Sequence, residues 1–269
     1  MRIYGVDFTC APRKAKPITV ASATLKQAVL RVEEMERLDS FEAFEAFLAR
    51  PGPWLGGFDF PFSLPRELVR DLGWPAQWPA LVAHCSRMSR LELRAALDAY
   101  RATRKAGSKY AHRATDYPAG SSSPMKLVNP PVALMFHEGA RRLLASDVCL
   151  PGLRENDSSK VALEAYPGLL ARKQLRIRAS YKSDTRAEHT RARSSARRQI
   201  LEGLQSGRPL GIEVRLKEKL KSAILADGSG DLLDAVVCAA QGAWGWTRRK
   251  ANYGLPAHAP AGEGWIVTA

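Results

Sequence analysis

The stretch WLGGFDFPFSLP, residues 54–65, ends an apolar run on a carboxylate, Asp59. The chain repeats this arrangement in MRIYGVDFTCAP, residues 1–12, where an apolar run leads to Asp7. Both places read Gly-x-Asp-Phe. Short apolar runs bounded by turn residues are typical of buried strands. We therefore expect each carboxylate at the carboxyl end of a strand.

The pattern around these two runs predicts a mixed α/β fold. Strands are expected at residues 1–8, 17–25, 28–35 and 54–60, with a helix at 40–49 before the last of them. Ser40 is a suitable N-cap for that helix. If the first and fourth strands are parallel neighbours, both carboxylates lie at the sheet edge where open α/β sheets bind ligands.

The rest of the chain is expected to complete a single domain over residues 1–269. Prolines break the pattern after residue 60, and residues 66–158 resemble a helical and loop insertion within that domain. The elements expected after it are a strand at 160–167, basic helices at 185–206 and 214–226, a helix at 228–246 and a small strand at 264–269.

The charge balance is the most informative feature of the composition. Lys and Arg number 41 against 27 Asp and Glu, a formal net charge of +14. Ten of these cations fall within residues 172–198, and a second cluster covers residues 101–113. Such an excess favours a polyanionic partner, of which nucleic acid is the commonest. The alternative is an arginine-rich surface that is merely solvated.

Cysteine usage and hydropathy suggest a cytoplasmic protein with no membrane association. The four cysteines have neither zinc-site nor CxxC spacing, which favours reduced thiols. The N-terminus has no pattern of a secretory signal, and no apolar stretch is long enough to span a bilayer.

The acids form a candidate metal site. Two uncompensated carboxylates, Asp7 and Asp59, would repel each other, and a bound cation relieves that repulsion. Their all-oxygen donors suit Mg²⁺ or Mn²⁺. Glu164 ends another apolar run, and Asp231 and Asp234 lie three residues apart on one face of the expected helix at 228–246.

Each acid also has an ordinary explanation. Asp7 can end its strand in an Asx-turn, and Asp59 can start the turn at Pro61. Glu164 can be exposed, and Asp231 can interact with a helix dipole. Together, however, they lie at the ends of elements expected to be buried, which favours a shared site.

Several residues are candidates for phosphate contact. In HRATD, residues 112–116, Arg113 can clamp a phosphate and bring Asp116 to the site; the alternative is that the two pair with each other in a solvated loop. Lys160, Lys182 and Arg186 are further candidates, with simple exposure as the alternative.

The segments GVDFTCAP, GFDFPFSLP, LEAYPGLL and DLLDAVVCA resemble those of the family catalogued as domain of unknown function 429. This resemblance spans nearly the whole chain, and the family is described as predicted nucleases with a ribonuclease H-like fold. It implies a mixed sheet of antiparallel and then parallel strands. It also implies that Asp7, Asp59 and Asp234 bind two divalent metals, with Glu164 as a fourth catalytic carboxylate and Asp231 as a neighbouring ligand.

The function expected on this basis is a hydrolase, a nuclease that cleaves phosphodiester bonds of DNA or RNA with two Mg²⁺ or Mn²⁺ ions. One alternative is a nucleic-acid-binding protein of the same fold without turnover. Another is an ATP-dependent phosphotransferase, weakened because only GSGD at residues 228–231 resembles a glycine-rich phosphate loop.

Overall fold

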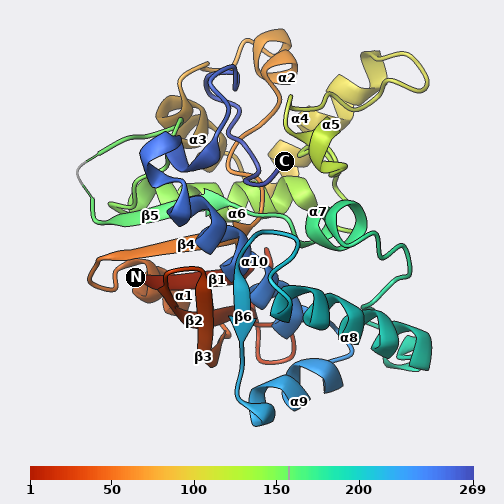
Figure 1. Cartoon of the computed structure of the whole chain (residues 1–269). Helices are drawn as coiled ribbons and strands as arrows, with labels where there is room; N and C mark the ends of the chain where they lie inside the picture. Colours follow the sequence, from red (N-terminus) through yellow and green to blue (C-terminus); the bar gives the residue numbers. More distant parts are fainter. Residues whose placement is uncertain (157) are drawn as a thin grey trace.

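Six strands form one mixed sheet in the computed structural model, which describes residues 1–156 and 158–269 (Figure 1). The strands are β1 Arg2–Asp7, β2 Ile18–Lys26, β3 Val29–Leu38, β4 Trp54–Asp59, β5 Lys160–Glu164 and β6 Glu213–Arg215. Their order across the sheet is β5-β4-β1-β2-β3-β6. β1, β2 and β3 are antiparallel, β4 and β5 run parallel to β1, and β6 runs parallel to β3. The predicted mixed α/β sheet is confirmed.

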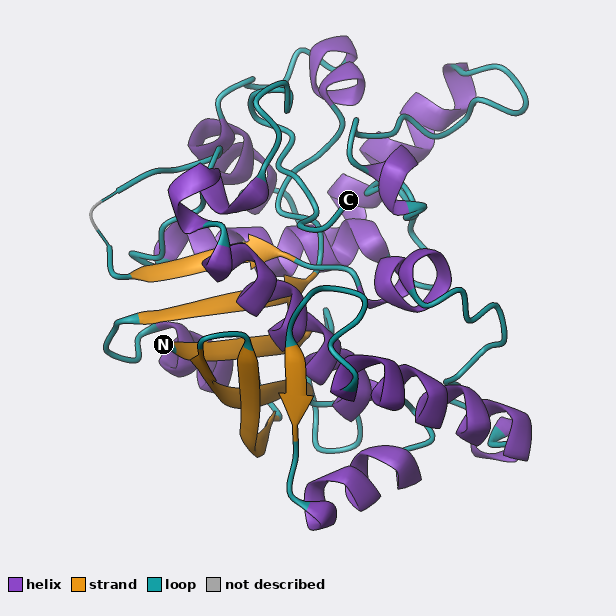
Figure 2. Ribbon diagram, in the orientation of Figure 1, coloured by secondary structure: helices purple, strands orange, loops and turns teal. Residues whose placement is uncertain are grey.

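Helices lie on both sides of this sheet (Figure 2). They are α1 Phe41–Leu48, α2 Arg66–Asp71, α3 Trp78–Ser86, α4 Arg90–Thr103, α5 Asp116–Ala119, α6 Val132–Ala145, α7 Pro167–Leu169, α8 Arg191–Gln205, α9 Glu218–Ala226 and α10 Asp231–Thr247. Ser40 caps α1 as predicted, with its hydroxyl accepting from the Ala43 amide. The described part of residues 66–158 holds α2 to α6 and no strand of the sheet. None of the described helices has the length and apolar character to cross a membrane.

Side chains alternate along the strands, so each face of the sheet is covered by its own hydrophobic core. Tyr4 and Val6 of β1 point to one face, where they pack with an aromatic cluster and with α1, α3, α4 and α6. Ile3 of β1 and Leu55 of β4 point to the other face and pack with α8, α9 and α10. Because side chains on a strand alternate, Asp7 and Asp59 belong to this second face.

The glycine of each Gly-x-Asp-Phe segment lies where α10 touches the sheet. Gly5 pairs with Gly57 across β1 and β4. A Cβ at Gly5 would lie 2.0 Å from the Ala235 carbonyl oxygen, and one at Gly57 would lie 2.2 Å from the Cys238 carbonyl oxygen. Only glycine allows the helix backbone to come this close to the strands.

Three elements differ from the sequence prediction. The basic helix expected at 185–206 begins at Arg191, after Thr190 caps it by accepting from the Arg193 amide. Residues 213–215 are not helical but form β6, since their backbone pairs with the edge of β3. The end of the chain has no strand, and Ile266 makes only a single bridge with Glu164.

We predict that Gly57→Ala lowers the free energy of unfolding by about 3 kcal/mol, because the new methyl group forces α10 away from the sheet. Urea denaturation would measure this. Gly107→Ala is the control, because its Cβ would meet nothing within 4 Å. The free energy of unfolding of this variant should fall only by the cost of a left-handed backbone at alanine, about 1 kcal/mol. Equal losses in the two variants would contradict the close contact.

Candidate metal site

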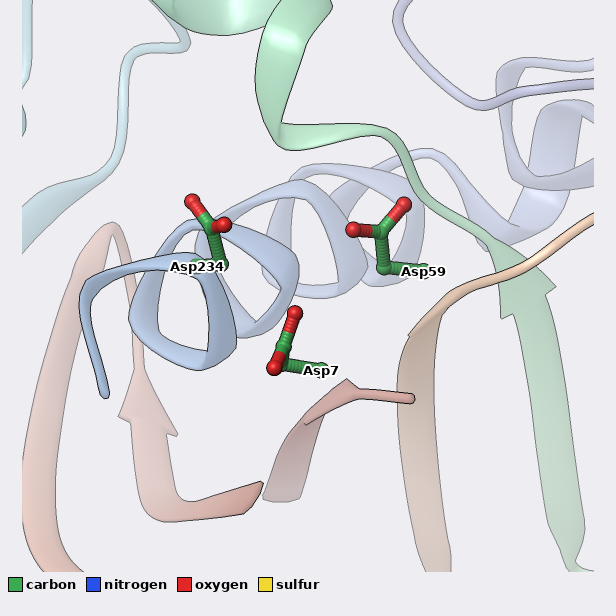
Figure 3. Close-up of side chains that lie close together, drawn as sticks. All are labelled: Asp7, Asp59 and Asp234. Carbon is green, nitrogen blue, oxygen red and sulfur yellow. The ribbon is translucent and has the colours of Figure 1, made fainter. Parts of the chain in front are cut away.

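Three carboxylates from distant parts of the chain converge beside the carboxyl ends of β1 and β4. Asp7 and Asp59 pair in register as the last residues of these parallel strands. Asp234 comes from the first turn of α10. One oxygen of each carboxylate lies within 4.8 Å of one from each of the other two. Figure 3 shows the Asp7 side chain directed toward the space between Asp59 and Asp234.

The three acids differ in their partners. Asp7 is 8% exposed, and no described residue forms a hydrogen bond with its carboxylate. Asp59 is partly buried and likewise lacks such a partner among the described residues. Asp234 is fully buried; it accepts from the Tyr181 hydroxyl at 2.6 Å and forms an ion pair with Lys182. The site therefore contains two unsatisfied carboxylates beside one satisfied carboxylate.

Burial and mutual repulsion make the ionised acids unfavourable. Burial raises the pKa of Asp7 well above its usual range, and the carboxylates of Asp234, Asp231 and Asp59 add to the rise. Burial also raises the pKa of Asp59 to about 7. The Lys182 ammonium opposes both rises without cancelling them. A cation with more than one charge would relieve this repulsion.

The donor set fits a hard divalent cation. It offers only carboxylate oxygens, which Mg²⁺ and Mn²⁺ prefer over the nitrogen and sulfur ligands of zinc sites. The buried carboxylate of Asp7, which has no hydrogen-bond partner in the part of the chain that the structure describes, is the feature that such an ion would satisfy. The residues brought together are Asp7, Asp59 and Asp234, three of the predicted site residues.

Glu164 does not join them, because of strand register. It pairs with Phe58 in β4, one residue before Asp59, so its side chain lies on the opposite face of the sheet. There it is 3% exposed and forms a bidentate ion pair with Arg113, at 2.6 and 2.8 Å, and accepts from the Phe62 amide. Its carboxylate is thus already neutralised.

Asp231 also lies outside the cluster. Its carboxylate pairs with Lys16 at 2.9 Å, and the same ammonium bonds to Asp184 at 2.7 Å. Asp231 is the first residue of α10 and pairs with Lys16 in the loop after β1, while Asp234 lies three residues further along the same turn. Both acids therefore lie at the start of α10, but only Asp234 belongs to the carboxylate cluster.

The predicted phosphate contacts separate into buried and exposed residues. Arg113 and Asp116 are each 1% exposed and pair with each other at 3.0 Å, as in the alternative interpretation, but in the protein interior rather than in a solvated loop. Lys160 is also buried and pairs with Asp147. All three side chains are therefore engaged in ion pairs within the protein. Arg186 is exposed, and Lys182 lies at the site itself.

Sequence reasoning missed Tyr181 and Lys16, which hydrogen-bond or pair with the acids of α10. Tyr181 precedes Lys182 in the basic stretch, whose evident feature in the sequence is its positive charge. Lys16 lies in the loop after β1. No local pattern in the sequence connects either residue to a helix that begins at Asp231.

A family described as "Protein of unknown function (DUF429)" matches residues 5–260. The chain belongs to this family. The match covers Asp7, Asp59 and Asp234 together with the basic segment between them. No curated protein and no solved structure matches the chain. This description names no activity.

We predict that Arg113→Met lowers the free energy of unfolding by about 4 kcal/mol, because it leaves the buried carboxylates of Glu164 and Asp116 without a counter-ion. Urea denaturation would measure the change. Arg70→Met is the matched control, since Arg70 pairs with Asp71 on the surface and its side chain is 75% exposed. That variant should unfold much like the native protein. A similar small effect for Arg113→Met would contradict a structural role.

Asp7→Asn should have the opposite effect and stabilise the metal-free protein by about 1 kcal/mol. The substitution removes one of three neighbouring carboxylates and supplies an amide that can donate to Asp59 or Asp234. The measurement is urea denaturation in the presence of a chelator. A loss of stability would show that the Asp7 carboxylate has a favourable partner within the protein.

Proposed function

We propose that this DUF429 protein is a metal-dependent nuclease with a ribonuclease H-like fold, which hydrolyses phosphodiester bonds of DNA or RNA. Asp7, Asp59 and Asp234 would hold Mg²⁺ or Mn²⁺. The observation that carries the proposal is the convergence of these three carboxylates, with Asp7 buried and unpartnered among the described residues. A two-metal mechanism remains part of the proposal.

The placement of the acids supports the fold assignment. They come from the first strand, the fourth strand and the last long helix, which are the positions that the family resemblance implies for metal ligands. The antiparallel β1–β3 followed by parallel β4 and β5 fits the same fold. Glu164, held by Arg113 on the other face, has no role in this form of the proposal.

The charge beside the site supports a polyanionic substrate. Lys182 reaches the cluster directly. The surrounding stretch exposes further cations on the surface, namely Arg172, Lys173, Arg176, Arg178, Arg186, Arg191 and Arg198. Lys and Arg side chains that neutralise phosphates supply most of the sequence-independent affinity for nucleic acid. The basic stretch would therefore position the backbone of the substrate near the carboxylates.

The residues of the chain would act by binding and orienting. When bound, divalent cations supply an activated water and stabilise charge on the leaving oxygen. The fixed strand ends and α10 hold the three carboxylates in place, so little rearrangement is needed to form the ligand set. No nucleophilic side chain is required, in keeping with the absence of a Ser-His-Asp or Cys-His pattern in the sequence.

A second candidate function is nucleic-acid binding without turnover. The ion pair between Lys182 and Asp234 favours it, because one of the three carboxylates is already neutralised. This protein would bind nucleic acid in a salt-sensitive way and give no metal-dependent product. The phosphotransferase alternative gains no similar support. An added Cβ at Gly228 or Gly230 would collide with His189 or Lys182, so these side chains already pack against both glycines of the loop that resembles a phosphate cradle.

We expect Asp7→Asn to reduce Mn²⁺-dependent cleavage of labelled DNA and RNA oligonucleotides by about 100-fold or more, because the site loses a metal ligand. Asp39→Asn, the same change at an exposed position, is the control and should cleave normally. Circular dichroism would verify that both variants are folded. Undiminished cleavage by folded Asp7→Asn would overturn the proposal, and salt-sensitive binding with no product from the native protein would select the second candidate.

A further inference from the structure

The Lys182 side chain reaches the carboxylate cluster from the protein surface. Its side chain is 42% exposed, whereas the Asp234 side chain that it pairs with is fully buried. The lysine stem passes over Gly230, where an added Cβ would lie 2.7 Å from the Lys182 Cβ. The ammonium thus reaches a buried acid on a flexible stem that solvent still contacts.

The segment that carries this lysine is attached by polar contacts and by the packing of Tyr181 against the core. We call residues 181–184 the latch segment. The Ser183 amide donates to the Gly228 carbonyl at 3.1 Å, and Arg197 donates to the Tyr181 carbonyl at 2.8 Å. Asp184 is connected to α10 only through Lys16, which pairs with both Asp184 and Asp231. Lys182, Asp184 and the neighbouring residues 185–190 are exposed, whereas Tyr181 packs against the core beside α10 and anchors the start of the segment.

A divalent cation and the Lys182 ammonium would compete for the same carboxylate. Lys182 forms an ion pair with Asp234, and one oxygen of each of the other two cluster carboxylates, Asp7 and Asp59, lies within 4.8 Å of an Asp234 oxygen. The charge of the ammonium therefore acts on the cluster as well as on Asp234. A metal ion bound within the cluster would have to coordinate an Asp234 oxygen near this positive charge. Release of the lysine removes the repulsion and returns the ammonium to water.

We infer that Lys182 is a resident cation that closes the carboxylate cluster, and that a divalent ion binds Asp7, Asp59 and Asp234 only by displacing it. This inference rests on the metal-binding part of the proposed function. Metal binding and latch release are then reciprocally linked. The contrasting arrangement keeps Lys182 on Asp234 as a fixed positive charge beside the bound metal.

The first experiment measures Mn²⁺ binding by isothermal titration calorimetry. Lys182→Met should bind Mn²⁺ about tenfold more tightly than the native protein, because the competing charge is gone. Lys182→Arg keeps a cation on the latch segment and should bind no more tightly than the native protein. Lys250→Met, which removes an exposed charge outside the basic stretch, is the matched control and should leave Mn²⁺ affinity unchanged.

The second experiment separates displacement from a simple change in local charge. Brief acetylation of the native protein, followed by mass spectrometry, reports how accessible the Lys182 amine is. Mn²⁺ should increase the acetylation of Lys182 severalfold and leave that of Lys173 unchanged. Unchanged or decreased labelling would overturn the inference, since the lysine would then remain on Asp234 beside the metal.

The results of these experiments show separately whether Mn²⁺ displaces Lys182 and whether the protein binds Mn²⁺ at all. If the native protein binds Mn²⁺ through Asp7 but Lys182→Met binds no more tightly, displacement is wrong and the metal site stands. If neither the native protein nor Lys182→Met binds Mn²⁺, both the inference and the proposed metal-dependent activity are wrong.

Discussion

The direct packing of α10 against β1 and β4 is the constraint on which the candidate site depends. Gly5 and Gly57 leave room for a helix backbone but not for a methyl group. Because strand side chains alternate, the carboxylates two residues later point to the same face as these glycines. The helix then brings Asp234 close to them. The repeated Gly-x-Asp-Phe segment therefore does two things at once: its glycine admits the helix, and its aspartate meets the helix end.

Two buried acids on opposite faces of the sheet are neutralised in different ways. Glu164 is held by Arg113, which is itself buried and forms a rigid bidentate pair. Asp234 is held by Lys182, a compact charge on a flexible stem that solvent still reaches. The first arrangement is suited to a permanent structural role, because both side chains are buried and neither can reach solvent. The second is the one for which we propose exchange with a divalent cation, and among the described residues Asp7 has no hydrogen-bond partner beside it.

Much of the fold could be predicted from local patterns. The apolar runs predicted β1 to β5, and Ser40 with its following phenylalanines predicted α1, because burial and capping depend on nearby residues. The short edge strand β6 was missed, since its three residues are extended only through pairing with β3. The last residues of the chain resembled a strand but lack a neighbour along which to pair, apart from the bridge at Ile266.

For the site, the sequence by itself determined that Asp7 and Asp59 lie alike at the carboxyl ends of two strands, because one motif is used twice. That these strands are parallel neighbours, which brings the two acids together, is decided by the tertiary structure. Only the tertiary structure decided which other acids join them. Strand register turned Glu164 to the opposite face, and long-range ion pairs engaged Asp231 and brought Lys182 onto Asp234. Register and ion pairing depend on residues far apart in the chain, and no local pattern contains that information.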